Sequence, residues 1–447
     1  MAKSRKHTAR GDDRPRDTHD ESVSRVPGTP WYRRISWTAI ALTAVVLLTS
    51  TCAVDPIRDA VTLGDAGEAR LSQTAAYLAI APVSNVLDTL TLLTVGQHIA
   101  IVVWAMLIFA AVRLVRARLH GTTGRSEAIA SVVFLVCLVA AYAAAAMAPR
   151  PMAQLVISDQ AVFAIDFHAH TKYSHDGRPG WEPGDVRDWH TGAGYDVAYI
   201  TDHRTFEGAE RGIAMNPSQA GQGEGTMLLE GLEAVSHGVH VNVLNAGRRY
   251  KGLTTADLRD IDEQSMALAS IILNNEPVII QTIPDDITRI AAAGGPGTPG
   301  VRGIELIDGS PRGLSQGRRD RARIIRLADS LNLALVVGSD NHGWGRAAPG
   351  WTLMRIPGWR GMGTDSLAGI IETALRLGRR ESTKVIERRV ADATTPVGIV
   401  FTGVSVPWRM FTTLTPDERV VWIIWVWAVV LIRRGRRAFR IRPSTTT

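Results

Sequence analysis

Histidine and carboxylate residues follow short apolar segments in the middle of this 447-residue chain. The first such segment ends with Asp166, His168 and His170. Alternate residues of a strand point to the same face, so these three side chains can point into one site. Two imidazoles two residues apart on a strand are a common chelating pair for a divalent metal ion. The alternative interpretation is a pair of ordinary surface or core histidines.

Residues of the same types follow several later segments. They are His175 and Asp176 in a turn, Asp202 and His203 after the second segment, Glu233 and His240 around the third, and Asp340 and His342 near the end of the region. A carboxylate such as Glu233 can bridge two metal ions, and two-metal sites suit phosphoryl chemistry. Asp202 is a candidate for fixing the tautomer of His203. Each group is a weak signal alone, but together they predict a site for several metal ions.

Cysteine contributes nothing to this region. The chain has two cysteines, Cys52 and Cys137, and both lie inside apolar runs, where cysteine acts as a small packing residue. The middle of the chain therefore has neither a disulfide nor a thiolate ligand. Any metal ion there must be held by His, Asp and Glu.

The elements that must position these residues alternate between short apolar strands and amphipathic helices. The expected strands are 162–168, 197–201, 227–235, 240–244, 278–283, 303–307 and 334–338, and the expected helices are 255–273, 315–331 and 365–377. This alternation favours a parallel sheet or barrel with helices outside, in which chemistry gathers where strands end. The glycine- and proline-rich stretch 294–300 is expected to be a loop.

These motifs, in this order, resemble the PHP (polymerase and histidinol phosphatase) superfamily. The matching pieces are DFHAHTKYSHDG at 166–177, ITDHR at 200–204, GLE at 231–233, VHVNVL at 239–244 and GSDNH at 338–342. The resemblance covers residues 162–389, about half of the chain. It implies a distorted (β/α)7 TIM-like barrel that holds two or three divalent ions (Zn, Mn or Fe) and hydrolyses phosphoesters.

The resemblance also assigns residues to the metal sites. It places His168, His170, Glu233 and Asp340 in a first site, Glu233 and His240 in a second, and His175 or Asp176 with His203 and His342 in a third. The family has a His-Pro pair after the fifth strand, where this chain has Ile283-Pro284. Either the second ion is lost, or a nearby residue compensates; the candidates are His237, Asp285 and Asp286.

The predicted function is hydrolysis of a phosphomonoester or phosphodiester by a water that the metal ions activate. Asp340 and His342 are the expected catalytic groups, with Asp340 or a metal-bound hydroxide handling the proton. Lys172 or Arg204 is expected to bind the substrate phosphate. His190 is expected to be structural. Two alternatives stay open, namely a hydrolase of C–N or C–O bonds and a membrane sensor or scaffold that binds metal or ligand without turnover.

Long apolar runs flank this region and predict a multi-pass membrane protein. The expected spans are 35–54, 93–112, 128–148 and 416–436, each about the length that one helix needs to cross a bilayer. The first run could instead be a signal peptide, and the last could lie in the bilayer interface behind its tryptophans. Thr415, Pro416 and Glu418 predict a capped helix start for the last span.

Charge sets the expected orientation. The net charge of +7 comes largely from basic clusters before the first span, after the second and after the last, whereas the loop 55–92 is poor in Arg and Lys. With four spans these clusters share one side, which the positive-inside rule identifies as the cytoplasm. Residues 1–34 would then be a disordered cytoplasmic segment, and the 55–92 loop and the 162–389 domain would be extracytoplasmic. This pattern indicates a cell-membrane protein rather than one that binds a nucleic acid template.

Overall fold

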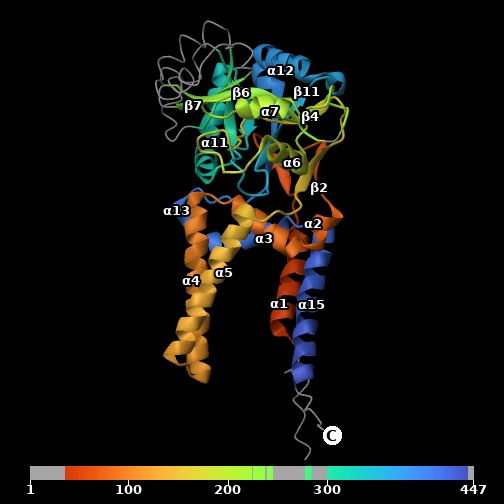
Figure 1. Cartoon of the computed structure of the whole chain (residues 1–447). Helices are drawn as coiled ribbons and strands as arrows, with labels where there is room; N and C mark the ends of the chain where they lie inside the picture. The colour runs from red at the N-terminus through yellow and green to blue at the C-terminus, as the bar shows by residue number, and fades with distance from the viewer. Residues whose placement is uncertain (1–35, 224, 237–238, 245–276, 284–299, 441–447) are drawn as a thin grey trace, which may run out of the picture.

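The computed structural model describes residues 36–223, 225–236, 239–244, 277–283 and 300–440. A sheet domain lies at one end, and long helices extend away from it in two legs (Figure 1). One leg consists of α4 (Val95–His120) and α5 (Gly124–Met147), and the other of α1 (Trp37–Leu48) and α15 (Pro416–Arg440).

The sheet domain is built on a ten-stranded mixed sheet in the order β1-β12-β11-β4-β5-β6-β7-β8-β9-β10. The strands are β1 (Ile57–Asp59), β4 (Val162–Asp166), β5 (Val197–Ile200), β6 (Met227–Ser236), β7 (Val239–Leu244), β8 (Val278–Gln281), β9 (Val301–Asp308), β10 (Ala334–Gly338), β11 (Gly350–Arg355) and β12 (Thr383–Arg388). The seven strands expected from the sequence are β4 to β10, so the predicted α/β pattern is confirmed.

The expectation of a parallel sheet is only partly right. β4, β5 and β6 are parallel, and so are β8, β9 and β10, but β7 is antiparallel to both of its neighbours. The chain turns directly from β6 into β7 within a few residues, and a connection that short allows only an antiparallel pair. β11 and β12 were not expected; they extend the sheet beyond β4 as antiparallel strands.

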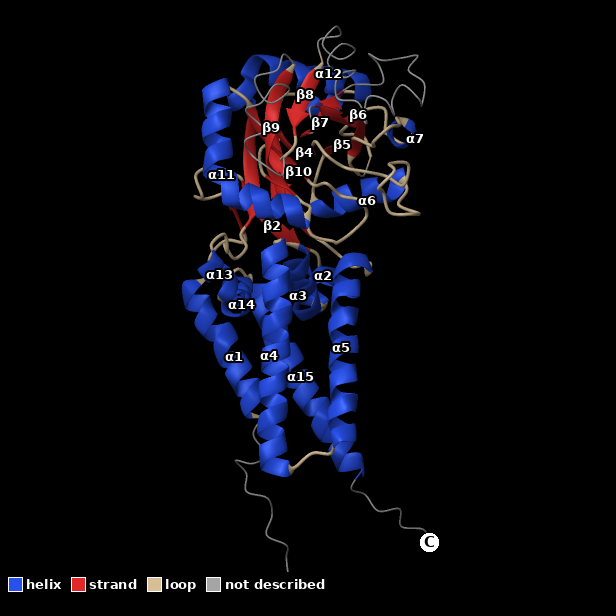
Figure 2. Ribbon diagram, turned by 90° about the vertical axis from the view of Figure 1, so that its left-hand side faces the viewer, coloured by secondary structure: helices blue, strands red, loops and turns tan. Residues whose placement is uncertain are grey.

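The sheet curls until its last strand reaches β4 again (Figure 2). The backbone N–H of Asp340, just after β10, donates to the carbonyl of His168 at 2.9 Å, and the N–H of His170 donates to the carbonyl of Asn341 at 3.1 Å. Ala169 and Asn341 form an isolated parallel bridge. The carboxyl ends of β4 and β10 therefore lie side by side, which is what brings their polar residues together.

Helices cover the outer face of the curled sheet. They are α6 (Pro183–Ala193), α7 (Glu207–Ile213), α11 (Pro311–Leu331) and α12 (Thr364–Gly378). β5 and β10 are buried along their whole length, as expected for strands that have side chains packed on both faces. α11 begins at Ser310, whose hydroxyl accepts from the N–H of Gly313, and ends at Asn332 in the left-handed conformation.

α11 and α12 confirm the helices expected at 315–331 and 365–377. The helix expected at 255–273 and nearly all of the loop expected at 294–300 lie outside the described residues.

The apolar segments form helices that differ in length. α4 and α5, with 26 and 24 residues, are long and apolar enough to cross a membrane, judged by length and composition. The first expected span is a shorter apolar helix, Trp37–Cys52, within the part of the chain that the structure describes. The last is α15, whose start has the expected capping box: the N–H of Thr415 donates to Glu418 Oε2 at 2.7 Å.

Shorter elements join the legs to the sheet domain. They are α2 (Ala75–Ala79), α3 (Ala81–Thr91), α13 (Pro396–Val400), α14 (Thr402–Thr412) and the two-stranded sheet of β2 (Ala69–Gln73) and β3 (Ala153–Ile157). A buried ion pair between Arg150 and Asp88 (2.9 Å) connects α3 to the segment after α5. The N–H of Gly345 donates to the carbonyl of Ala146 at 2.7 Å, which ties a loop of the sheet domain to the end of α5.

Candidate metal centre

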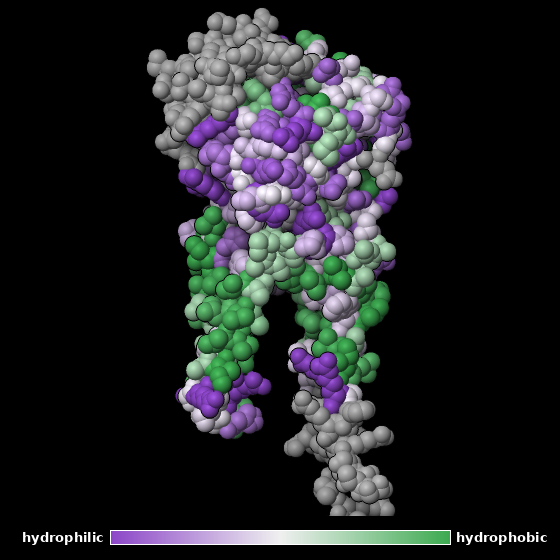
Figure 3. Space-filling view, viewed as in Figure 1, coloured by the Kyte–Doolittle hydropathy of each residue, from purple (hydrophilic) through white to green (hydrophobic). Residues whose placement is uncertain are grey.

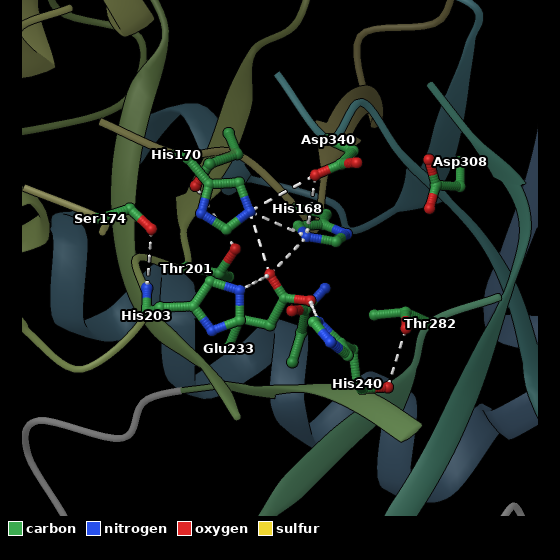
Figure 4. A network of polar contacts seen from close by, with 12 residues as sticks. His168, His170, Ser174, Thr201, His203, Glu233, His240, Thr282, Asp308 and Asp340 are labelled. Carbon is green, nitrogen blue, oxygen red and sulfur yellow. Dashed lines mark hydrogen bonds and ion pairs between the residues drawn. The ribbon is translucent and has the colours of Figure 1, made fainter. Parts of the chain in front are cut away.

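Glu233, on β6, lies at the centre of a group of histidines (Figure 4). His168, His170 and His203 are buried, and His240 is exposed. Its Oε2 is 3.0 Å from His168 Nε2, 3.1 Å from His170 Nε2 and 3.1 Å from His203 Nε2. Its Oε1 is 2.6 Å from His240 Nδ1. The four imidazoles come from three places along the chain, after β4, after β5 and on β7, and the curl of the sheet brings them to one carboxylate.

A second carboxylate, Asp340, faces the same space from the end of β10. Its Oδ1 lies 3.4 Å from His168 Nε2 and 3.5 Å from His170 Nε2, and these two nitrogens are 3.0 Å apart. Asp340 has a φ of +47°, a conformation that non-glycine residues rarely adopt and that concentrates at functional sites. The backbone thus holds Asp340 in an unfavourable conformation that aims its carboxylate at the histidines.

A third group surrounds Asp176, in the turn after the first histidine pair. Asp176 Oδ2 is 3.2 Å from His342 Nε2 and 3.8 Å from His203 Nε2, and its Oδ1 is 4.0 Å from His175 Nδ1. Ser174 donates its hydroxyl to Asp176 Oδ1 at 2.6 Å, which fixes the carboxylate. Asp176 and His175 both face this group, so the structure keeps both of the alternatives that the sequence offered.

These side chains form four groups in which the donor atoms all lie within 4.8 Å of one another. The groups are His168, His170 and Asp340; His170, Asp176 and His342; His175, Asp176 and His203; and His203, Glu233 and His240. A zinc ion lies about 2.0–2.2 Å from its N and O ligands, so two ligands of one tetrahedral ion are roughly 3.3–3.6 Å apart. The spacing of the donors fits divalent ions shared between neighbouring groups.

Electrostatics in the cluster are strongly coupled. Burial by itself lowers the pKa of His168, but the surrounding carboxylates, led by Glu233 and Glu305, outweigh it and raise that pKa well above its usual value. Burial by itself raises the pKa of Glu233, and the imidazoles of His168 and His203 hold it well below its usual value. Without a cation, protons on the histidines must balance the buried carboxylates, and a bound metal ion would replace those protons.

Glu305, on β9, is a part of the site that the sequence reasoning missed. It is fully buried, and its Oε1 lies 2.9 Å from His168 Nδ1, the nitrogen that faces away from Glu233. A carboxylate on the outer nitrogen of a histidine fixes the tautomer and orientation of a metal ligand. Its signal in the sequence was a single glutamate inside the apolar run of β9.

Gly338, at the end of β10, makes room for this contact. A Cβ at Gly338 would lie 2.2 Å from Glu305 Oε1 and 2.8 Å from His168 Cβ. The close approach of the strand backbone to this histidine–carboxylate pair therefore requires glycine.

Asp166 does not join the cluster, contrary to the expectation that it shares a face with His168 and His170. Its Oδ2 lies 2.7 Å from His190 Nε2, and its Oδ1 accepts from the N–H groups of His168 and Ser339. The alternation rule fails here because the chain bends at Phe167, where β4 has ended. His190 is buried in this pair, in agreement with the structural role expected for it.

The two cations expected to bind phosphate lie at the edge of the cluster. Lys172 Nζ is 2.5 Å from Glu182 Oε1, outside the group of histidines. Arg204 follows His203 directly, is partly buried and has a φ of +63°. Asp202 accepts from the N–H of Thr171 at 2.6 Å and from its hydroxyl at 2.5 Å, so it positions the loop after the first histidine pair.

The position of the missing fifth-strand histidine is occupied by Ile283, which is buried. The hydroxyl of neighbouring Thr282 donates to the carbonyl of His240 at 2.8 Å. Among the described residues, it is His203 that joins Glu233 and His240 in the group nearest to this strand. The three other compensating candidates, His237, Asp285 and Asp286, lie outside the described residues.

Comparisons with known proteins give remote structural similarity. No protein-family model and no curated protein matches the chain. PsfC from Pseudomonas syringae is 14% identical, with a TM-score of 0.31, over 60% of this chain and 99% of its own. A two-domain Bacteroides vulgatus protein containing a predicted PHP-like metal-dependent phosphoesterase is 14% identical, with a TM-score of 0.32, over 51% of this chain and 66% of its own. The lesion-specific endonuclease EndoQ from Pyrococcus furiosus is 13% identical, with a TM-score of 0.31, over 44% and 53%. Similarity of this degree does not by itself assign a family or an activity.

Proposed function

We propose that the sheet domain is a metal-dependent phosphoesterase of the PHP superfamily that hydrolyses a phosphomonoester or phosphodiester. The observation that carries this proposal is the convergence of three imidazole nitrogens on one oxygen of Glu233, with Asp340 facing the same space. Buried carboxylates need compensating positive charge, and a ring of histidine nitrogens around them suits Zn, Mn or Fe. Bound ions would neutralise the phosphate oxygens and lower the pKa of a water molecule.

The side chains around the cluster supply the remaining roles. Asp340, whose Oδ1 lies 3.3 Å from His342 Nδ1, takes up the proton of the attacking water. His342 lies beside it at the mouth of the site and orients the phosphate. Arg204, partly buried next to His203, steadies the phosphate charge. Lys172 can contribute only after it leaves Glu182, so it has the smaller role.

The fold proposed for this domain is the distorted (β/α)7 barrel of that superfamily. Strands β4 to β10 would be the seven strands of the barrel, and β1, β11 and β12 would form an antiparallel extension of its sheet. The proposal is supported by the return of the β10 end to β4, through the hydrogen bonds between residues 168–170 and 340–341. All the candidate ligands then lie at one rim of the barrel, where the chemistry of such folds gathers.

We further propose that the legs are embedded in a cell membrane. α4 would be about 39 Å long at 1.5 Å per residue, more than the roughly 30 Å of a bilayer core. The visible faces of both legs are largely hydrophobic between the sheet domain and their far ends, where hydrophilic residues return (Figure 3). α1 would complete a span with the residues before it, and α15 would cross with its apolar middle.

Basic residues at the far ends of the legs support one orientation. Arg116, Arg118 and Arg125 lie around the turn between α4 and α5, and Arg433, Arg434 and Arg436 lie near the end of α15. Both groups are on the side away from the sheet domain (Figure 1). By the positive-inside rule that side is the cytoplasm, so the sheet domain would be extracytoplasmic. Its substrate would be a phosphorylated molecule outside the cytoplasm rather than a nucleic acid template.

The test of the phosphoesterase uses the full chain purified in detergent micelles. Its metal content is measured by elemental analysis, beside the Mn- or Zn-dependent hydrolysis of an aryl phosphate. We expect two or three ions per chain and turnover that requires them. His120→Ala, which removes an exposed histidine at the far end of α4, is the matched control and leaves both unchanged.

Bound metal without turnover of any phosphate ester would contradict the enzyme and favour a membrane sensor that binds metal. Turnover of amides in place of phosphates would favour the C–N hydrolase instead.

A further inference from the structure

One cavity connects the candidate metal centre to the membrane helices. Its volume is about 520 Å³, in the range typical of small-molecule sites. It lies between loops of the sheet domain and the ends of α3, α4 and α5 that are nearest to the sheet. This inference concerns the substrate of the proposed phosphoesterase and rests on that function.

The wall formed by the sheet domain is polar. Asp176, Asp340 and His342, all candidate metal ligands, line it, together with Ser339 and Asn341. Asn341 is buried, and its Nδ2 has no hydrogen-bond partner among the residues that the structure describes. An unpaired buried donor is costly unless a ligand accepts from it, and a phosphate or ester oxygen in the cavity would do so.

The opposite wall comes from the membrane helices and is mainly apolar. Leu90 of α3, with Ala145 and Ala146 of α5, lines this wall, and Tyr142 of α5 lies 3.4 Å from His98 of α4 beside them. The small alanine side chains leave the volume open at the top of the leg. Neither wall has a Lys or Arg among its lining residues.

The mouth of the metal centre faces the membrane side of the domain. The loop that carries Asp340 and His342 continues to Gly345, whose N–H donates to the carbonyl of Ala146 on α5. Trp344, on the same loop, is 50% exposed and lines the cavity, and tryptophan is enriched at bilayer interfaces. Below this level α4 and α5 expose apolar side chains, including Ile99, Val103 and Val139.

We infer that the substrate is a membrane lipid phosphoester. Its phosphate lies at the polar wall beside Asp340 and His342, Asn341 donates to one of its oxygens, and its apolar chain lies along Leu90 and Ala146 toward the bilayer. A soluble phosphoester would leave the apolar wall unused, whereas a lipid uses both walls and enters without leaving the membrane.

The experiment compares two substrates that share a headgroup, using the full chain in phosphatidylcholine vesicles with Mn²⁺. Dioleoyl phosphatidic acid is the lipid probe, and glycerol 3-phosphate is the soluble one. We expect the lipid to be hydrolysed with a kcat/KM at least tenfold higher. Ala146→Phe, which fills the apolar wall, lowers that value at least tenfold and leaves the metal content unchanged. The matched control is Ala140→Phe, on an exposed position of the same helix.

Equal rates for the two probes, with no effect of Ala146→Phe, would overturn the lipid substrate and leave the phosphoesterase standing. Failure on every phosphate ester, the aryl phosphate included, would instead remove the proposed function. A photoreactive phosphatidic acid gives a readout that needs no turnover. Crosslinks to the peptides that contain Leu90 or Tyr142, lost in Ala146→Phe, support the site, and crosslinks spread evenly over both legs contradict it.

Discussion

Two arrangements of histidine around a buried carboxylate involve residues of, or directly after, β4. They differ in how completely the hydrogen-bonding groups are paired. In the first, His190 Nε2 lies 2.7 Å from Asp166 and its Nδ1 lies 2.7 Å from the carbonyl of Val186, so each ring nitrogen has one partner. In the second, Glu233 faces four imidazoles at once, and His170 Nδ1 has no hydrogen-bond partner among the described residues. In the first arrangement every ring nitrogen is paired, whereas the second brings together more donor atoms than it pairs, and these groups could hold a metal ion.

Burial of a histidine beside a carboxylate therefore does not distinguish a structural pair from a candidate metal centre. The candidate metal centre differs because several imidazole nitrogens face one carboxylate oxygen, more than that oxygen needs as hydrogen-bond partners. Its members are called the surplus group.

Substitutions in the surplus group should remove activity. Asp340→Asn and His170→Ala should each lower the kcat/KM for an aryl phosphate by roughly 10²–10⁴-fold, because each removes a metal ligand or the proton acceptor. The melting temperature should fall by no more than removal of the metal itself lowers it, since neither side chain completes a structural pair. Full activity in both variants would end the proposed mechanism.

Removal of the metal should lower both activity and stability. Dialysis against a chelator should abolish turnover and lower the melting temperature, because the carboxylates of Glu233 and Asp340 then lose their compensating ions. Mn²⁺ or Zn²⁺ added back should restore both. The measurement is activity and calorimetric melting of one preparation before chelation, after it and after reconstitution; activity that survives chelation would contradict a metal centre.

Breaking the satisfied pair should instead cost stability. Asp166→Ala leaves His190 Nε2 unpaired in the core and removes the acceptor for the N–H of Ser339, so we expect a loss of about 3–5 kcal/mol in the free energy of unfolding. Denaturant unfolding measures this loss. Metal content per folded chain should stay near that of the unmodified protein, and a selective loss of metal without destabilisation would place Asp166 in the metal centre.

Glu305 shares features of both arrangements. It pairs with His168 Nδ1, as Asp166 pairs with His190, but the other nitrogen of His168 faces Glu233 in the candidate metal centre. Glu305→Gln should weaken metal binding by roughly 10–100-fold, as expected for a group that orients a ligand. Gly338→Ala, which pushes Glu305 away from His168, should have at least as large an effect. Competition with a metal-sensitive dye measures the affinity, and an unchanged value in both variants would refute the orienting role.

A carboxylate with no histidine completes the comparison. Burial raises the pKa of Asp196 to about 6, and its Oδ2 accepts from the N–H of Ala164. The folded state therefore binds more protons than the unfolded state between about pH 4 and 6, so the contribution of Asp196 to stability should rise as the pH falls from about 6 to 4 and stay constant above about pH 6.

Asp196→Asn keeps an acceptor without the charge and should flatten this pH dependence, with a gain of about 1–2 kcal/mol at pH 7.5 because Asp196 is only partly buried. Melting temperatures at pH 5 and 7.5 measure it. A steeper pH dependence in the variant would show that the sign is wrong.

The apolar pattern of the sequence predicted some of the long helices better than others. Apolar length identified α4 and α5 closely, because a run without charges determines a long helix almost locally. Apolar length was a weaker guide to the first and last expected spans. The first is a shorter helix, and the last is α15, in which acidic residues and arginines flank a short apolar middle. Whether these helices share one bilayer depends on how they pack around the sheet domain, which no single segment encodes.

The sequence by itself determined the seven strands β4 to β10 and most of the candidate donor residues, because apolar runs and ligand residue types are local properties of each segment. Asp166 was assigned wrongly since a bend after β4 ended the alternation, and Glu305 was missed since a lone glutamate in an apolar strand carries no local signal. Only the tertiary structure decided which imidazoles share Glu233 and that Asp340 and His342 line a cavity together with residues of α3, α4 and α5. Those contacts join residues far apart in the chain, and they form only when the sheet curls and brings β10 back to β4.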